Sequence, residues 1–175
     1  MMAEEPVDAA FDSVRRLAER CSVNLEHSEH VAEISARILR AVSRHYEVDL
    51  SLERLLRAAA LLANSGNAVS YSRHHVHSYY IIRNADLVGF NDEEIEVIAL
   101  SARYHRKSPP KESHEEFGRL PVDRRHDVEL MAAVLRIATA LDRSHDRCMR
   151  EISSSSRDGS LVLSVRHACR NQSSV

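Results

Sequence analysis

Five histidines stand close to the expected ends of helices: His27, His74, His75, His77 and His105. Imidazole binds zinc and nickel, exchanges protons near neutral pH and, when protonated, attracts phosphate. The spacing of the five matches no common metal motif, since HExxH is absent. The phosphate-loop, dinucleotide and nucleophile motifs GxxxxGK[ST], GxGxxG and GxSxG are absent too. The histidines therefore indicate a site without defining its chemistry.

Basic residues accompany these histidines in two segments. One segment opens an expected helix, and the other closes the next helix. Helix N-termini and arginine guanidinium groups both favour phosphate oxygens. We therefore predict an anion-binding groove formed by eight residues: Arg73, His74, His75, His77, Arg103, His105, Arg106 and Lys107.

Plainer interpretations of the same residues stay open. His27 and His105 lie on apolar helix faces, where a hydrogen-bonded core histidine is common. The histidines at 74–77 could be a solvated helix start that binds nickel or zinc adventitiously. The basic segment 103–107 is also typical of a helix end whose cations complement the helix dipole. Tyr80 and its aromatic neighbours are expected in the core rather than as stacking platforms.

The composition narrows the class of protein. The chain has 175 residues, 43% of them hydrophobic and 29% charged, which is typical of one globular domain. Its net charge of -2 provides no overall field for nucleic acid, and no apolar run is long enough for a membrane span. The N-terminus lacks the apolar segment of a secretory signal. Three cysteines without CxxC spacing indicate reduced thiols, so we expect a cytoplasmic protein.

Apolar periodicity predicts an all-α domain of six to seven helices with a small C-terminal β-hairpin. The helical core should span about 7–145 and the hairpin about 147–167 of a single domain, 1–175. Ser51, Ser72 and Asn91 are the expected helix caps, with Glu94 completing a capping box after Asn91. Residues 108–122 should form a polar loop. The helices are expected at about 7–20, 27–46, 52–63, 74–85, 92–107 and 123–141.

The order of these segments resembles the HD superfamily of helical metal-dependent phosphohydrolases. The resemblance becomes specific at YSRHHVHSYYIIRNADLVGF (71–90), ARYHRK (102–107) and LRIATALDRSH (135–145). These strings closely resemble the C-terminal HD-like domain of the exopolyphosphatase/guanosine pentaphosphate phosphohydrolase family, over roughly residues 12–166. The resemblance implies an HD-like helical fold.

The metal positions of the superfamily are mostly lost in this chain. The resemblance places its ligands at His27, Ala63, Asn64 and Thr139. Only His27 retains a ligand side chain, because Ala63 has no donor atom and the other two are neutral. Asp142 lies one turn beyond Thr139, so its side chain need not point the same way. We therefore expect no metal, no cofactor and no hydrolysis by this domain alone.

The resemblance also implies partners. In the resembled family an actin-like ATPase-fold domain performs the hydrolysis, the HD-like domain lines the path of polyphosphate, and the proteins work as dimers. We therefore expect polyphosphate or a phosphorylated small molecule as ligand. A second copy or an ATPase-fold domain is the expected protein partner, with no membrane or nucleic acid. Two alternatives remain: a degenerate phosphohydrolase using His27, His75, His77, His105 and Asp142, or a purely structural interaction module.

Overall fold

The structure is a computed structural model that describes residues 9–145 and 148–167. Over these ranges the chain forms seven α-helices, one short 3₁₀ helix and a two-stranded hairpin, which confirms the predicted fold class. The elements in chain order are α1 (Ala9–Arg20), α2 (Leu25–Val42), α3 (Leu52–Leu62), the 3₁₀ helix η1 (Ser65–Ala68), α4 (His74–Arg83), α5 (Asp92–Tyr104), α6 (Glu115–Gly118), α7 (Val122–Leu141), β1 (Met149–Arg157) and β2 (Ser160–His167).

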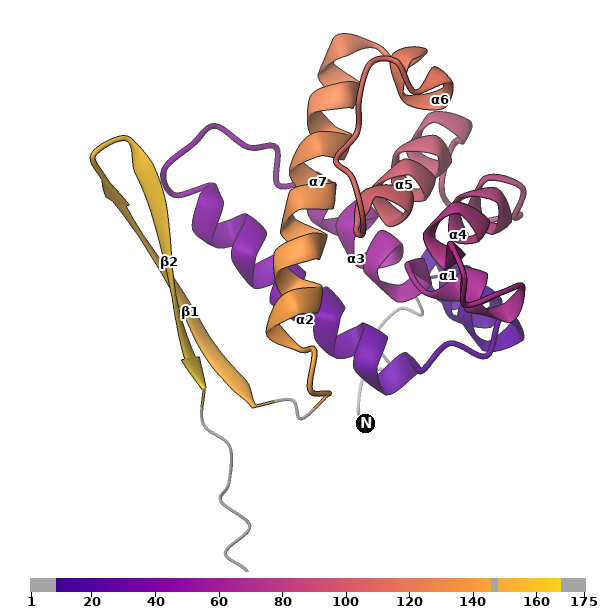
Figure 1. Ribbon diagram of the computed structural model, residues 1–175, viewed down its shortest axis with the longest axis horizontal. Helices are drawn as coiled ribbons and strands as arrows, with labels where there is room; N and C mark the ends of the chain where they lie inside the picture. Colours follow the sequence, from indigo (N-terminus) through magenta and orange to yellow (C-terminus); the bar gives the residue numbers. More distant parts are fainter. Residues whose placement is uncertain (1–8, 146–147, 168–175) are drawn as a thin grey trace, which may run out of the picture.

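Helix α3 occupies the centre of the helical body. Its sequence leaves little polar surface, and all residues from Ala58 to Leu62 are buried. The neighbours that cover it are α1, α2, α5 and α7. Long helices α2 and α7 pack against each other and against α3, while α4 and α5 pair on the far side of the body (Figure 1). This arrangement brings the starts of α2 and α4 to the same side as the ends of α5 and α7.

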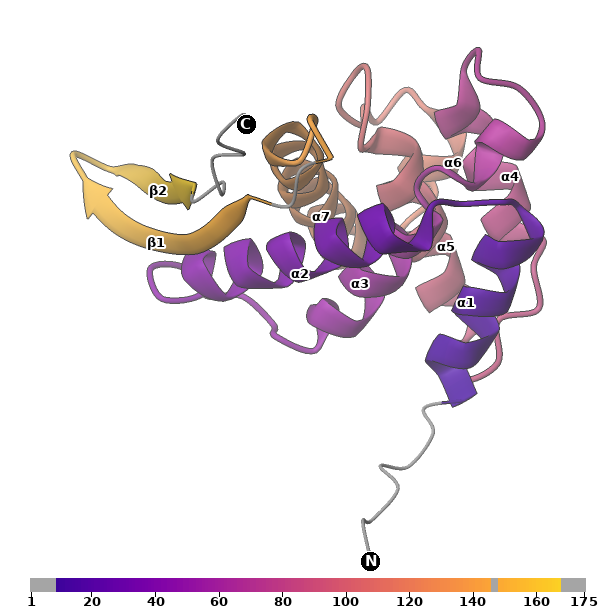
Figure 2. The same cartoon turned by 90° about the horizontal axis from the view of Figure 1, so that it is seen from below.

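The hairpin flanks α2 on the side away from α4 (Figures 1 and 2). Its strands are antiparallel, with Ile152 opposite Val165. The turn at Asp158 and Gly159 has positive φ at both residues, the conformation that an Asp-Gly pair favours in a two-residue hairpin. The Ser154 hydroxyl donates to the backbone oxygen of Ala41 over 2.9 Å and so attaches β1 to the end of α2.

The helix caps in the structure agree only in part with those predicted from the sequence. Asn91 and Glu94 form the predicted capping box at the start of α5. Ser51 makes no capping hydrogen bond, because its hydroxyl donates to Asp49 over 2.7 Å. The residue that precedes α4 is Arg73, in a left-handed conformation with φ of 53°, so Ser72 is not the cap.

Three further expectations need correction. Tyr80 is 54% exposed rather than in the core. The loop 108–122 contains the short helix α6, because Phe117 is drawn into the core and is 1% exposed. Cys148 is disulfide-bonded, so the prediction of three reduced thiols is wrong for this residue. No helix in the described residues is long and apolar enough to cross a bilayer.

Candidate anion-binding cleft

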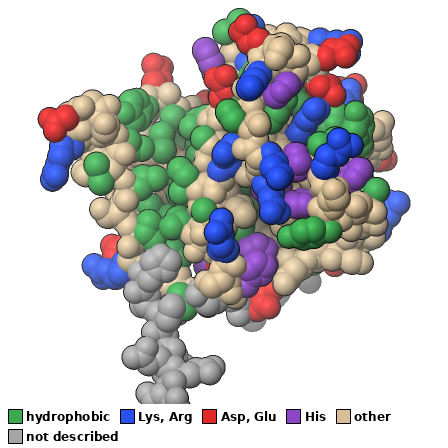
Figure 3. All heavy atoms as spheres, in the orientation of Figure 1, with side chains coloured by type: hydrophobic (Ala, Val, Ile, Leu, Met, Phe, Trp, Pro, Cys, Tyr) green, Lys and Arg blue, Asp and Glu red, His purple; other side chains and the backbone are tan. Residues whose placement is uncertain are grey.

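A cleft of about 760 Å³ opens where the starts of α2 and α4, the segment η1 and the ends of α5 and α7 meet. Lysine, arginine and histidine side chains gather on this face, between α7 and α4 (Figure 3). The lining residues are His27, Asn64, Asn67, Tyr71, His74, His105, Arg106, Lys107, Arg136, Thr139, Ala140, Arg143 and His145. No aspartate or glutamate is among the described residues that line the cleft.

Close backbone packing holds the wall between α3 and α4 in place. A Cβ atom on Gly66 would lie 2.0 Å from the backbone oxygen of His74, so only glycine fits there. The buried Ser78 hydroxyl donates to the Ala63 oxygen over 2.8 Å and accepts from the Gly66 N–H over 2.9 Å. These contacts fix η1 against the first turns of α4. They thereby place Asn64 and His74 on the same cleft.

His74 and His105 form the innermost histidine pair of the cleft. They are 3% and 5% exposed, and their ring centroids lie 5.9 Å apart. The Nδ1 atom of His74 lies 3.2 Å from the Tyr71 backbone oxygen, and that of His105 lies 2.5 Å from the Ala102 oxygen. Burial lowers the pKa of His105 from 6.5 to about 4 and also lowers the pKa of His74. Both imidazoles are therefore neutral near pH 7.

A second histidine group lies where α2 begins and α7 ends. The Asn24 side chain caps α2 by accepting from the backbone N–H of His27. His27 Nδ1 lies 2.8 Å from Oδ2 of Asp142, which is 1% exposed, and the His145 ring stacks on His27 at 3.7 Å. Burial lowers the pKa of His27, although the hydrogen bond with Asp142 acts in the opposite direction. Asp142 therefore contacts a residue of the cleft, a direction that its place one turn beyond Thr139 had left open.

The residues present do not suit a divalent metal. Ala63, Asn64 and Thr139 supply no anionic ligand, and Nδ1 of His27 is bonded to Asp142. Among the residues that the structure describes, no group of three or more histidine, cysteine, aspartate or glutamate side chains is arranged to hold a metal ion.

The arginine and lysine side chains of the cleft are unpaired within the described part of the chain. Arg106, Lys107, Arg136 and Arg143 form no ion pair with any residue of 9–145 or 148–167. Most arginines elsewhere in these ranges are paired, namely Arg15, Arg37, Arg40, Arg54, Arg57, Arg83, Arg103, Arg119, Arg124, Arg125 and Arg166. Four unneutralised cations on one concave surface produce a local positive potential in a chain whose net charge is -2.

The structure brings half of the predicted anion-binding residues to this cleft. His74, His105, Arg106 and Lys107 line it, whereas Arg73, His75 and His77 are absent from the lining. Arg103 is also elsewhere: its guanidinium lies 3.0 Å from Glu116 and over the rings of Tyr79 and Tyr104.

Sequence reasoning missed the contribution of α7 to the cleft. Arg136, Thr139 and Arg143 are spaced three and four residues apart and so share one helix face. That spacing was a usable signal, because Thr139 had already been placed at the site by the resemblance. Tyr71, Asn67 and His145 had no comparable signal.

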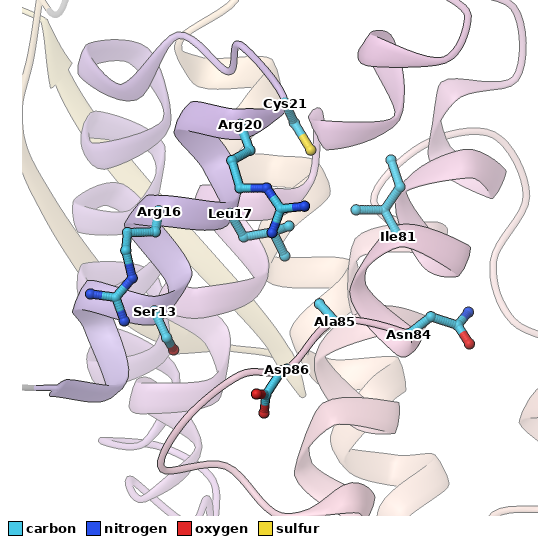
Figure 4. A pocket seen from close by; sticks show the side chains of 9 residues that line it. All are labelled: Ser13, Arg16, Leu17, Arg20, Cys21, Ile81, Asn84, Ala85 and Asp86. Carbon is cyan, nitrogen blue, oxygen red and sulfur yellow. The ribbon is translucent and has the colours of Figure 1, made fainter.

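A second cavity, of about 480 Å³, lies between α1 and the end of α4. Arg16 and Arg20 line it, but so does Asp86. Figure 4 shows the guanidinium of Arg20 near Leu17 and facing Ile81, while Arg16 points away from them. The two cations do not converge and a carboxylate is present, so this cavity is less suited to an anion than the histidine-lined cleft.

Fold and cleft together define a helical domain with a histidine-lined basic cleft. The chain belongs to the Ppx/GppA phosphatase family, since the family model "Ppx/GppA phosphatase, domain III" matches residues 11–172. This confirms the resemblance found in the sequence.

Two curated relatives carry the name guanosine-5'-triphosphate,3'-diphosphate pyrophosphatase. The protein of Pseudoalteromonas atlantica (strain T6c / ATCC BAA-1087) is 26% identical over 135 residues, which is 77% of this chain and 26% of the relative. That of Pseudoalteromonas translucida (strain TAC 125) is 29% identical over 133 residues, 75% of this chain and 25% of the relative. The match therefore covers about a quarter of each relative.

Proposed function

We propose that this chain is a non-catalytic, metal-free HD-like accessory domain that binds polyphosphate or a similar phosphate polyanion in the cleft. The observation that carries the proposal is the set of four cations, Arg106, Lys107, Arg136 and Arg143, without acidic partners among the described residues. A phosphate chain would supply the missing negative charge and would be attracted mainly through release of its counterions.

The cleft also matches such a ligand in size and polarity. Its volume of about 760 Å³ falls within the range of roughly 300–1,000 Å³ of small-molecule sites. Asn64, Asn67 and Thr139 add neutral hydrogen-bonding groups along the same wall. The names of the two relatives, which act on a phosphorylated nucleotide, agree with a phosphate ligand for this domain.

The hypothesis of a protein partner rests on a separate feature. Within the described residues the hairpin is a two-stranded sheet, so each strand has one edge that pairs with no other described strand and on which another chain can pair. A second copy of the domain or an actin-like ATPase-fold domain remains our expected partner. This contact would accompany anion binding rather than replace it.

The experiment is a titration with long-chain polyphosphate at several salt concentrations. We expect the logarithm of the affinity to fall linearly with the logarithm of the salt concentration, by roughly 0.7 to 0.9 per phosphate contact. Arg106→Gln and Arg143→Gln should each weaken binding and reduce this slope. Arg37→Gln is the matched control, because Arg37 is paired with Glu33 outside the cleft.

Two results would contradict the proposal. Binding that is independent of salt, or unchanged in both cleft variants, would remove the cleft as the binding site and leave the structural-module alternative. Phosphate release from polyphosphate or nucleotides upon addition of manganese, iron or zinc would favour the degenerate phosphohydrolase. The same titration with purified, untagged protein and a parallel assay for released phosphate distinguishes these alternatives.

A further inference from the structure

The tautomers of His74 and His105 follow from their hydrogen bonds. In each ring Nδ1 faces a backbone carbonyl oxygen, of Tyr71 and Ala102 respectively. A carbonyl oxygen only accepts hydrogen bonds, so Nδ1 must be the protonated nitrogen. In a neutral imidazole the other nitrogen, Nε2, then carries a lone pair and can only accept. Both rings are therefore fixed as hydrogen-bond acceptors.

Neither Nε2 atom has a partner within the described part of the chain. Nε2 of His74 is shielded from solvent and unbonded, a state that costs free energy in a folded protein. The hydrogen bonds of His105 in the described residues involve only its backbone and Nδ1. Both side chains are more than nine-tenths buried and line the cleft. An unpartnered acceptor at the wall of a cleft calls for a ligand that donates a hydrogen bond.

The surroundings keep the two rings neutral. The titratable or charged groups that face them are His75 and His77 of α4, together with Arg106 just beyond α5. All of these disfavour a further positive charge, and burial lowers the pKa of both rings. The cleft thus combines cations, which attract an anion, with two neutral acceptors, which repel its bare oxygen atoms.

We infer that His74 and His105 make the cleft specific for an anion that carries its own proton. The ligand class is hydrogen phosphate, or the protonated end group of a phosphate ester or a phosphate chain. The P–OH group donates to Nε2 of His105, which unlike Nε2 of His74 is not shielded from solvent, while the remaining oxygens bind the cations. This inference rests on the proposed function and specifies which end of the polyanion enters the cleft.

Sulfate is the appropriate comparison for phosphate. The two anions are similar in shape, but sulfate has no proton near neutral pH, whereas inorganic phosphate keeps at least one and a phosphate end group takes one up with a second pKa of about 6. Sulfate would place a bare oxygen against the Nε2 lone pair of His105. Sites built around hydrogen bonds reject ligands that leave buried groups unpaired.

The experiment is calorimetric titration of the chain with inorganic phosphate and with sulfate at pH 7 and constant ionic strength. We expect phosphate to bind roughly tenfold or more tightly than sulfate, the effect of one well-made buried hydrogen bond. His74→Phe and His105→Phe should bring this ratio toward one. Arg106→Gln, the control, should weaken both anions and leave the ratio unchanged.

A measurement on the unmodified chain guards against variants that fail to fold. Nitrogen-15 NMR of the imidazoles should show both rings with Nδ1 protonated, and phosphate should shift Nε2 without protonating it. Equal binding of the two anions, a preference that survives both phenylalanine variants, or protonation of both ring nitrogens on binding phosphate would overturn the inference alone. Binding of neither anion nor polyphosphate would overturn the proposed function with it.

Discussion

Arginine side chains are paired with glutamates between α2 and α3, whereas in the cleft they form no ion pair with the described residues. Between α2 and α3, arginine and glutamate alternate in an ion-pair network. Arg40 and Arg57 both bind Glu53, at 2.6 and 3.1 Å, and Arg57 and Arg37 both bind Glu33, at 3.1 and 2.9 Å. Every cation in this network has a carboxylate, so little potential remains outside it.

The cleft has cations without carboxylates. Arg106, Lys107, Arg136 and Arg143 come from two separate segments and converge without any acidic lining residue in the described part of the chain. Asp142, at the end of α7, is buried and bonded to His27. The comparison shows that an arginine-rich composition does not reveal function. The proposed function rests instead on four cations that share one cleft and form no ion pair among the described residues.

The largest expected effect is a pH dependence of the free energy of unfolding, in which the cleft and the ion-pair network act in different pH ranges. Burial holds the pKa of His105 at about 4, against 6.5 for an ordinary histidine. Between pH 6.5 and 4 the unfolded chain binds a proton that the folded chain excludes. The free energy of unfolding should therefore fall by roughly 3 kcal/mol over this window because of His105.

The ion-pair network between α2 and α3 should lose its contribution to the free energy of unfolding only at lower pH. Burial acts to raise the pKa of Glu33, but hydrogen bonds from Arg37 and Arg57 lower it on balance. The stabilisation that ionised Glu33 provides is complete above pH 4.5, and it is lost as the pH falls through the lowered pKa of Glu33. Denaturant unfolding at several pH values checks both windows. His105→Gln should flatten the pH dependence between 6.5 and 4, and an unchanged slope in this variant would contradict the assignment to His105.

The second expected effect concerns the wall of the cleft. Gly66→Ala places a methyl group within 2.0 Å of the His74 oxygen, so α4 must shift. Overpacking of this kind costs typically 1–3 kcal/mol. We expect a lower midpoint in urea and weaker polyphosphate binding, because His74 moves with α4. Gly159→Ala, where a methyl group meets no atom within 4 Å, should not affect binding. Unchanged stability and binding in Gly66→Ala would show that the close packing of η1 against α4 does not hold the cleft in shape.

Local sequence rules predicted most of the fold. The apolar stripe of α7, with Val128, Met131 and Leu135, is buried as its helical spacing required. The capping box of Asn91 and the C-terminal hairpin were also predicted correctly, because each depends on residues close together in the sequence. Ser72 failed as a cap because the chain enters α4 through a left-handed Arg73, a conformation that only tertiary packing sustains.

The sequence predicted the cleft in part, through two basic segments and through the positions that the resemblance places at His27, Asn64 and Thr139. His105, Arg106 and Lys107 formed one cluster and all reached the cleft. Arg103, two residues before His105, did not, because it pairs with Glu116 of α6, a helix that the loop sequence did not indicate. Whether a cation is neutralised depends on contacts between distant segments. Charge spacing along a single sequence cannot supply them.

The smallest expected effect compares single cations from the two regions. Arg57 is 28% exposed and bonded to two glutamates. Arg57→Gln should therefore lower the free energy of unfolding by about 0.5–1 kcal/mol. A double-mutant cycle with Glu53→Gln should assign a few tenths of a kcal/mol of this loss to the Arg57–Glu53 pair. Arg136 has no acidic partner among the described residues and shares the cleft with three other cations. Arg136→Gln should therefore leave stability unchanged or raise it slightly, because repulsion between like charges is relieved. Chemical denaturation of both variants at low salt, repeated at 1 M salt, tests this. The two variants should converge at high salt, where exposed charges are screened over about 3 Å. If Arg136→Gln destabilised the fold as much as Arg57→Gln does, the cleft cations would be structural, and their lack of partners would no longer indicate a ligand.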